Sequence, residues 1–106
     1  MILEVAIVNV RKGEEKAFED AFSQAQQIIA SMGGYRSHEL RRCIKQRGRY
    51  ILLVHWDTIE HHTEGFRQSE AYQEWKSLLH HFYDPFPIVE HYETVNSINN
   101  KEQLYL

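Results

Sequence analysis

The spacing of hydrophobic and polar residues changes several times along this chain, and each change marks an expected element. Residues 2–10 (ILEVAIVNV) form a short apolar run rich in β-branched residues, which predicts a strand. One face of this strand would carry Leu3, Val5 and Ile7, and the other Ile2, Glu4, Ala6 and Val8. The glutamate in the second set indicates that this face is not an ordinary dry core.

A helix is expected after the break at Lys12-Gly13. Glu14 and Glu15 suit the positive end of a helix, and Gly33-Gly34 supplies its stop. Its apolar stripe recurs every three or four residues and comprises Phe18, Phe22, Ala25, Ile29 and Met32. The spacing therefore predicts one long amphipathic helix between the two breaks.

A hairpin should follow, with arms at residues 35–44 and 49–56. The loop between the arms ends in Gly48, and a glycine there favours a tight reversal of the chain. Residues 51–54 are continuously apolar, which indicates a strand that is covered on both faces.

The next helix is interrupted at Gly65. Asp57 is expected to cap its first piece together with Glu60, and Ser69 to cap its second piece. The buried stripe of the second piece comprises Ala71, Trp75, Leu78 and Phe82. Two prolines, at positions 85 and 87, then prevent the helix from continuing, and residues 88–95 alternate as a last strand.

The order β-α-β-β-α-β predicts a ferredoxin-like α+β fold, with a four-stranded antiparallel sheet and both helices on one face. The other face, expected to carry the Glu4, Ala6 and Val8 side of the first strand, would need a cover. A second copy packing sheet on sheet would supply it, so we expect a homodimer. Residues 1–96 would form the domain, and residues 97–106 a tail that is loose or contacts the partner subunit.

Composition narrows the class of protein. A chain of 106 residues with 42% hydrophobic residues fits one domain with a real core. A net charge of −3 argues against a nucleic-acid partner, and no apolar run reaches the ~18 residues of a membrane span. No signal peptide is expected at the N-terminus. A single cysteine, Cys43, excludes an internal disulfide and makes a reducing cytoplasm the simplest location.

Basic residues are concentrated in the expected hairpin. Six of the twelve lie within positions 36–49: Arg36, Arg41, Arg42, Lys45, Arg47 and Arg49. Such a run is typical of a solvated hairpin, and a groove for an anionic ligand is the alternative.

The histidines do not predict a metal site. His61-His62 and His80-His81 are adjacent pairs, and neighbours on a helix point about 100° apart, so neither pair can chelate as a unit. His91 shares a strand face with Glu93, but two ligands do not make a site, and no HxxxH or HExxH spacing occurs. We therefore expect no metal and no other cofactor, and histidines at helix ends are by default surface groups.

Three stretches together resemble the antibiotic biosynthesis monooxygenase family. They are VRKGEEKAFEDAF, YILLVHWDTIEHHTEGFRQSEAYQEW and PFPIVEHYE, and the resemblance extends over about residues 2–95. It implies a dimeric α+β barrel with a pocket between the sheet and the broken helix of each subunit. The family includes cofactor-free oxygenases that convert phenols or hydroquinones to quinones with O2, haem-degrading enzymes, and proteins that bind or isomerise small metabolites.

The chain departs from two branches of that family. The asparagine, tryptophan and histidine of the haem-degrading branch fall on Ala6, Phe66 and Lys76, which disfavours haem binding or degradation. Many quinol-oxidising relatives carry one histidine at the position of Phe66 and another near Ala71, and both are absent. Tyr72 matches an aromatic position that is common in the family.

The leading hypothesis is a cofactor-independent monooxygenase acting on a small phenolic or hydroquinone-like compound. Such chemistry needs a base or anion stabiliser in an apolar pocket with aromatic walls. His80 and Tyr72 are the catalytic candidates, and His55, His81 and His91 are other possible bases. The expected pocket residues are Glu4, Trp56, Phe66, Trp75 and His91. The alternative is a non-catalytic dimeric barrel that binds a small metabolite, and Trp75 also suits a plain core position.

Overall fold

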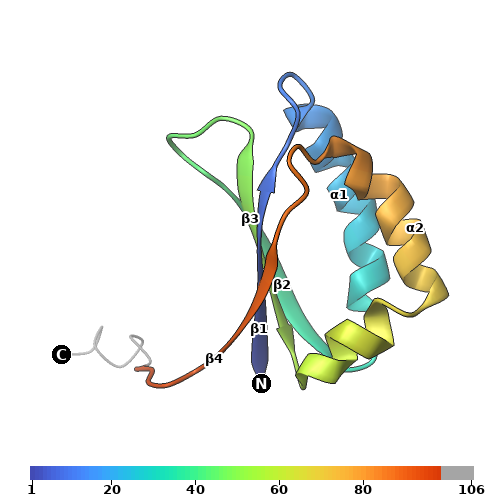
Figure 1. Ribbon diagram of the computed structural model, residues 1–106, viewed down its shortest axis with the longest axis vertical. Helices are drawn as coiled ribbons and strands as arrows, with labels where there is room; N and C mark the ends of the chain where they lie inside the picture. Colours follow the sequence, from blue (N-terminus) through green and yellow to red (C-terminus); the bar gives the residue numbers. More distant parts are fainter. Residues whose placement is uncertain (99–106) are drawn as a thin grey trace.

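One four-stranded sheet and two helices make up the domain, as the computed structural model of the protein shows (Figure 1). Residues 1–98 are described. The strands are β1 (Ile2–Asn9), β2 (Tyr35–Arg42), β3 (Arg49–Trp56) and β4 (Val89–Glu93), all antiparallel in the order β2-β3-β1-β4. Helices α1 (Glu15–Ala30) and α2 (Glu70–Leu79) cover the same face. The predicted ferredoxin-like architecture is therefore confirmed.

Two short helical segments flank α2. The π-helix η1 (His61–Phe66) precedes it, and the 3-10 turn η2 (His80–Phe82) follows it. The predicted cap of α2 is confirmed, because the Tyr72 backbone N–H donates to Ser69 Oγ at 3.2 Å. The predicted capping role of Asp57 is wrong. Asp57 instead pairs with Arg36, and the backbone N–H of His61 donates to Thr58 Oγ1.

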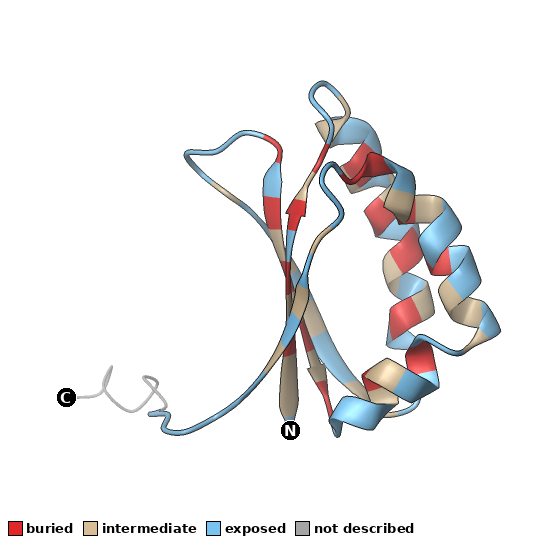
Figure 2. Ribbon diagram, viewed as in Figure 1, coloured by how far each residue is buried: buried red, intermediate tan, exposed pale blue. Residues whose placement is uncertain are grey.

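The two faces of β1 are the reverse of the prediction. Glu4, Ala6 and Val8 lie under the helices, since their partners on β3 are Val54, Leu52 and Tyr50, all buried. Figure 2 shows the buried residues gathered between the sheet and the helices. Both faces of β1 are largely apolar, so alternation alone could not tell which one the helices cover.

The opposite face of the sheet is also apolar. β1 contributes Leu3, Val5 and Ile7 to it, and the register places His55, Leu53 and Ile51 of β3 opposite them. Ile7 is 42% exposed, and the other apolar residues of this row, Leu3, Val5, Ile51 and Leu53, are half-buried. The face that would pack against a second copy is therefore the one that carries Leu3, not the one that carries Glu4.

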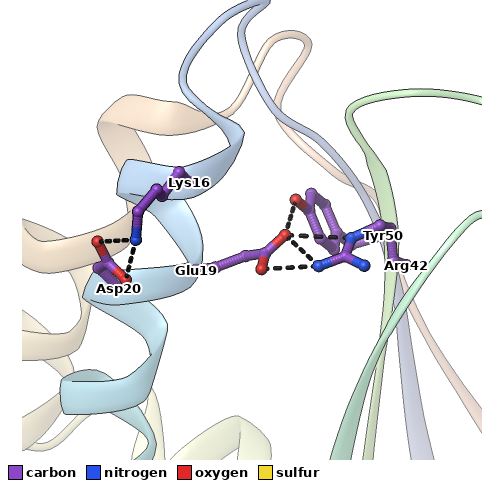
Figure 3. A network of polar contacts seen from close by, with 5 residues as sticks. All are labelled: Lys16, Glu19, Asp20, Arg42 and Tyr50. Carbon is purple, nitrogen blue, oxygen red and sulfur yellow. Dashed lines mark hydrogen bonds and ion pairs between the residues drawn. The ribbon is translucent and has the colours of Figure 1, made fainter.

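Four of the six basic residues of the hairpin lie beside carboxylates within the domain. Arg42 of β2 contacts Glu19 of α1 at 2.8 Å, and Glu19 also accepts a 2.6 Å hydrogen bond from Tyr50 of β3 (Figure 3). Arg36, Arg41 and Arg47 are likewise close to Asp57, Glu39 and Glu15, respectively. These pairs support the solvated-hairpin interpretation over an anion-binding groove.

Two further predictions concern the ends of the fold and its surroundings. No helix within residues 1–98 has the length and apolar character needed to cross a membrane. Most of the predicted tail, residues 99–106, lies outside the described residues, so its contact with a partner subunit stays a prediction.

Candidate active site

A small cavity lies between the sheet and the broken helix. Its volume is about 60 Å³, and its lining comes from β1, β3 and β4 on the sheet side and from residues 62–87 on the helix side. Of the predicted site residues, the structure brings Glu4, Phe66, Tyr72, Trp75 and His80 together in this lining. Their chemical roles remain proposals.

The helix side of the cavity is an aromatic wall. Phe66, at the end of the π-helix, is 1% exposed and contacts the rings of Tyr72 and Trp75 edge to face at 5.2 and 5.6 Å. Trp75 also packs against Phe22 of α1 at 5.9 Å, so it belongs to the core and to the cavity at once. Edge-to-face pairs of this kind give the wall a defined shape.

The sheet side contributes a buried carboxyl group. Glu4 is 5% exposed, lines the cavity, and accepts a 2.9 Å hydrogen bond at Oε1 from the indole Nε1–H of Trp56. Trp56 is therefore not part of the cavity lining, but it holds the Glu4 carboxyl group in place. Burial raises the pKa of Glu4, while the Trp56 hydrogen bond and the charge of Arg67 act in the opposite direction.

His62, not predicted as a site residue, completes the polar part of the site. It lines the cavity, is 3% exposed, and stacks on Trp56 with ring centroids 5.5 Å apart. Its Nε2 lies 3.3 Å from Glu4 Oε1, and its Nδ1 lies 2.8 Å from His91 Nε2. Burial and the nearby charge of Arg67 lower the pKa of His62 to about 3, so its imidazole is neutral at physiological pH.

The prediction of surface histidines is therefore wrong for His62. The signal that could have revealed it is its spacing: His62 precedes Phe66 by four residues and shares its inward-facing helical stripe. His91 does not line the cavity, but it lies opposite Glu4 in the β1–β4 pairing and contacts His62.

His80 borders the cavity at the start of η2. Its ring lies 5.8 Å from that of Tyr72 and 4.9 Å from that of Phe86. Burial and the charge of Lys76 lower the pKa of His80, so it presents a neutral imidazole. Burial raises the pKa of Tyr72, whose phenol stays protonated.

Two other candidate bases lie elsewhere. His55 is paired with Leu3 on the outer face of the sheet, where Ser37 Oγ lies 3.2 Å from its Nδ1. His81 is exposed on η2. Neither belongs to the cavity lining, which removes both from the list of possible bases at this site.

Glu4, His62 and His91 lie in a row and do not surround a common point, as the ligands of a metal ion would. His62 uses opposite ring nitrogens for Glu4 and His91, so the three groups do not converge on one point. Within residues 1–98, no three histidine, cysteine, aspartate or glutamate side chains gather as a metal site would require.

These features define a ferredoxin-like α+β domain with an aromatic cavity and a buried carboxyl group between its sheet and its helices. The chain belongs to the antibiotic biosynthesis monooxygenase family, whose profile matches residues 1–78. The family resemblance predicted from the sequence is thereby confirmed.

Individual relatives agree with that assignment. The uncharacterized protein YczJ of Bacillus subtilis (strain 168) is 54% identical over 95 residues, 90% of this chain and 100% of YczJ. A Bordetella bronchiseptica protein, provisionally named an antibiotic biosynthesis monooxygenase, is 35% identical with a TM-score of 0.86, covering 90% of this chain and 97% of its own. SnoaB, a cofactor-independent oxygenase from Streptomyces nogalater, shares the fold with a TM-score of 0.79 at 13% identity, covering 92% of this chain and 95% of its own.

Proposed function

We propose that this protein is a cofactor-independent monooxygenase that oxidises a small phenolic or hydroquinone-like compound with O2. The observation that carries the proposal is a buried carboxyl group, Glu4, facing a cavity with aromatic walls. Family membership and the shared fold with SnoaB, itself a cofactor-independent oxygenase, support it.

The reaction balances without an added reductant. A phenol with a free para position and O2 give a p-quinone and water. A base first removes the hydroxyl proton, and the phenolate then gives an electron to O2. A new C–O bond forms at the para carbon, giving a hydroperoxide. Its O–O bond breaks as that carbon loses its hydrogen, and the distal oxygen leaves as water. The protein must therefore supply a proton acceptor and stabilise the phenolate.

The residues of the cavity fit these tasks. Glu4 and the neutral His80 are both able to accept the phenol proton, and the Tyr72 hydroxyl can hydrogen-bond the substrate oxygen. Arg67 also lines the cavity and makes no ion pair within residues 1–98, so its charge is available to the phenolate. Phe66 and Trp75 hold the ring.

The substrate must open the cavity as it binds. The volume of about 60 Å³ is smaller than that of the cavity of about 150 Å³ that accepts benzene in another protein. Phe86 lines the cavity and is 60% exposed, so its side chain can swing outward without leaving a hole in the core. We assign Phe86 as the movable wall.

We further propose that the protein acts as a homodimer. The apolar row Leu3, Val5, Ile7, Ile51 and Leu53 on the outer face of the sheet suits sheet-on-sheet packing with a second copy. The single cysteine, Cys43, is a free thiol and suits a reducing cytoplasm.

A non-catalytic function is the second candidate, because the cavity is small in this conformation. In that case the protein would bind a small metabolite without turnover. O2 uptake separates the two: purified protein, treated with a chelator and free of flavin, is given a panel of phenols and hydroquinones. Enzyme-dependent uptake of one O2 per phenol, without release of H2O2, supports the oxygenase. Thermal stabilisation by a panel member without uptake supports the binding protein.

A further inference from the structure

Glu4 offers one carboxyl oxygen to the cavity while the other is held by the protein. The Trp56 indole and His62 Nε2 both approach Oε1, at 2.9 and 3.3 Å. No contact within residues 1–98 engages Oε2. A substrate hydroxyl can therefore reach Oε2 without displacing either partner of Oε1.

The chemistry of these partners fixes the direction of their protons. The Trp56 indole nitrogen can only donate, so Oε1 acts as an acceptor. When Glu4 is ionised, Nε2 of His62 must also carry its proton, because two lone pairs would repel. Neutral His62 then has an acceptor at Nδ1, and His91 Nε2, 2.8 Å away, must be the donor.

The His62 ring is held in this orientation from three sides. Its face stacks on Trp56 with an interplanar angle of 21°, and its two nitrogens lie beside Glu4 and His91. The ring is only 3% exposed. The tautomer and the direction of the ring are thus set by the surrounding residues.

We propose that Glu4 accepts the substrate proton and that His62, backed by His91, is a positioning residue that holds Glu4 ionised and aimed at the cavity. The proposal rests on the proposed function, since it names the proton acceptor of the same site. In the series of contacts from His91 through His62 to Glu4, each N–H group donates in the direction of the carboxylate. Oε2 of Glu4 is then left to act as the base.

The other titratable and charged groups around Glu4 come from the segments packed against β1. These groups are Arg67, Tyr72, Tyr83 and His80. Burial opposes the ionised form of Glu4, whereas the Trp56 hydrogen bond and the Arg67 charge favour it. Removing one donor should therefore raise the pKa of Glu4.

The direct test uses the wild-type protein and needs no substrate. Long-range 1H–15N NMR spectra report which ring nitrogen of each histidine carries the proton. We expect Nε2–H in both His62 and His91 at neutral pH. A His62 found as Nδ1–H would overturn the proposal, since its Nε2 would then present a lone pair to Glu4.

The second test follows the titration of the 13C-labelled Glu4 carboxyl in variants. His62→Phe should raise the midpoint by about one pH unit, and His62→Gln, which keeps an N–H and a carbonyl, should restore most of the shift. His81→Gln is the matched control, because His81 is exposed and outside the cavity. If His62→Phe does not fold, His91→Phe on the half-buried edge strand should give a smaller shift in the same direction.

Unchanged Glu4 titration in the folded variants would contradict the positioning role. With an active wild type, the acidic limb of the kcat/KM profile should move up in His62→Phe and return in His62→Gln. If no phenol is oxidised by the wild type, the proposed function fails, whereas the NMR results still decide the role of His62.

Discussion

The indole of Trp56 donates a 2.9 Å hydrogen bond to Glu4, joining the last residue of β3 to the fourth residue of the chain beneath the helices. Both residues are buried, at 0% and 5% exposure. The pair places a carboxyl group inside an aromatic core and gives it a fixed donor. This hydrogen bond fixes the orientation of the buried carboxyl group that we propose as the base.

Removing the donor from this pair should cost stability. Trp56→Phe keeps the aromatic ring but leaves Glu4 Oε1 without its indole partner. We expect a loss of about 1–3 kcal/mol in the free energy of unfolding, measured by denaturant titration. In the Glu4→Gln background, Trp56→Phe should cost less than in the wild type, and an equal cost in both backgrounds would argue against the coupling.

Glu4→Gln should increase the free energy of unfolding at neutral pH. The folded-state pKa of Glu4 is raised, so ionising it above that pKa weakens the folded state. The variant should therefore be more stable than the wild type at neutral pH, by on the order of 1 kcal/mol, and equal to it below about pH 4. Thermal unfolding across this pH range measures the difference, and a variant less stable at every pH would show that the charge itself stabilises the fold.

His62 should make the protein sensitive to acid. Its pKa is lowered to about 3, while the unfolded chain has the ordinary value of 6.5. Its neutral form thus contributes stability above about pH 6.5, and that contribution declines as the pH falls toward 3. Between pH 7 and 5, we expect the free energy of unfolding to fall more steeply in the wild type than in His62→Gln. Equal slopes would mean that His62 is protonated without cost in the folded state.

Gly34 should tolerate no side chain. Its φ is +80°, and a Cβ there would overlap the ring of His61. Gly34→Ala should lower the free energy of unfolding by about 1–3 kcal/mol. Gly33→Ala is the matched control, because a Cβ at Gly33 meets nothing within 4 Å. Equal effects of the two changes would contradict the packing of η1 against this turn.

The outer face of the sheet should govern assembly. Leu53 lies opposite Val5 in the middle of the apolar row, so Leu53→Glu would place a charge in a sheet-on-sheet interface. We expect a dimeric wild type and a monomeric variant in sedimentation experiments. Gln27→Glu, an exposed change on α1, should leave the dimer intact. A monomeric wild type at micromolar concentration would refute this interface.

Much of the fold was predictable because each break in the pattern has a local cause. Gly33-Gly34, Ser69 and the two prolines end or begin elements wherever they occur, and the periods between them give the element types. The sequence could not predict which face of β1 is buried, because Leu3, Val5 and Ile7 are as apolar as the residues on the buried face. The register with β3 decides which residues share a face, and burial under α1 and α2 shows which face the helices cover.

The site was predictable in part for a similar reason. Tyr72, Trp75 and His80 lie on or beside the stripe of one helix, and Glu4 interrupts an apolar strand, so local patterns point to them. His62 was missed because its contacts with Glu4 and His91 join residues far apart in the chain. Adjacent histidines at a helix start have no local signature of such a contact.

Oxygen labelling with 18O2 tests the central claim most directly, with a phenol from the active panel and the product reduced at once to stop exchange with water. We predict one 18O atom per product molecule from the wild type without flavin or metal. In Glu4→Gln we predict a kcat lower by about 10²- to 10³-fold. The account would be contradicted by product without label, or by a Glu4→Gln variant that turns over as fast as the wild type.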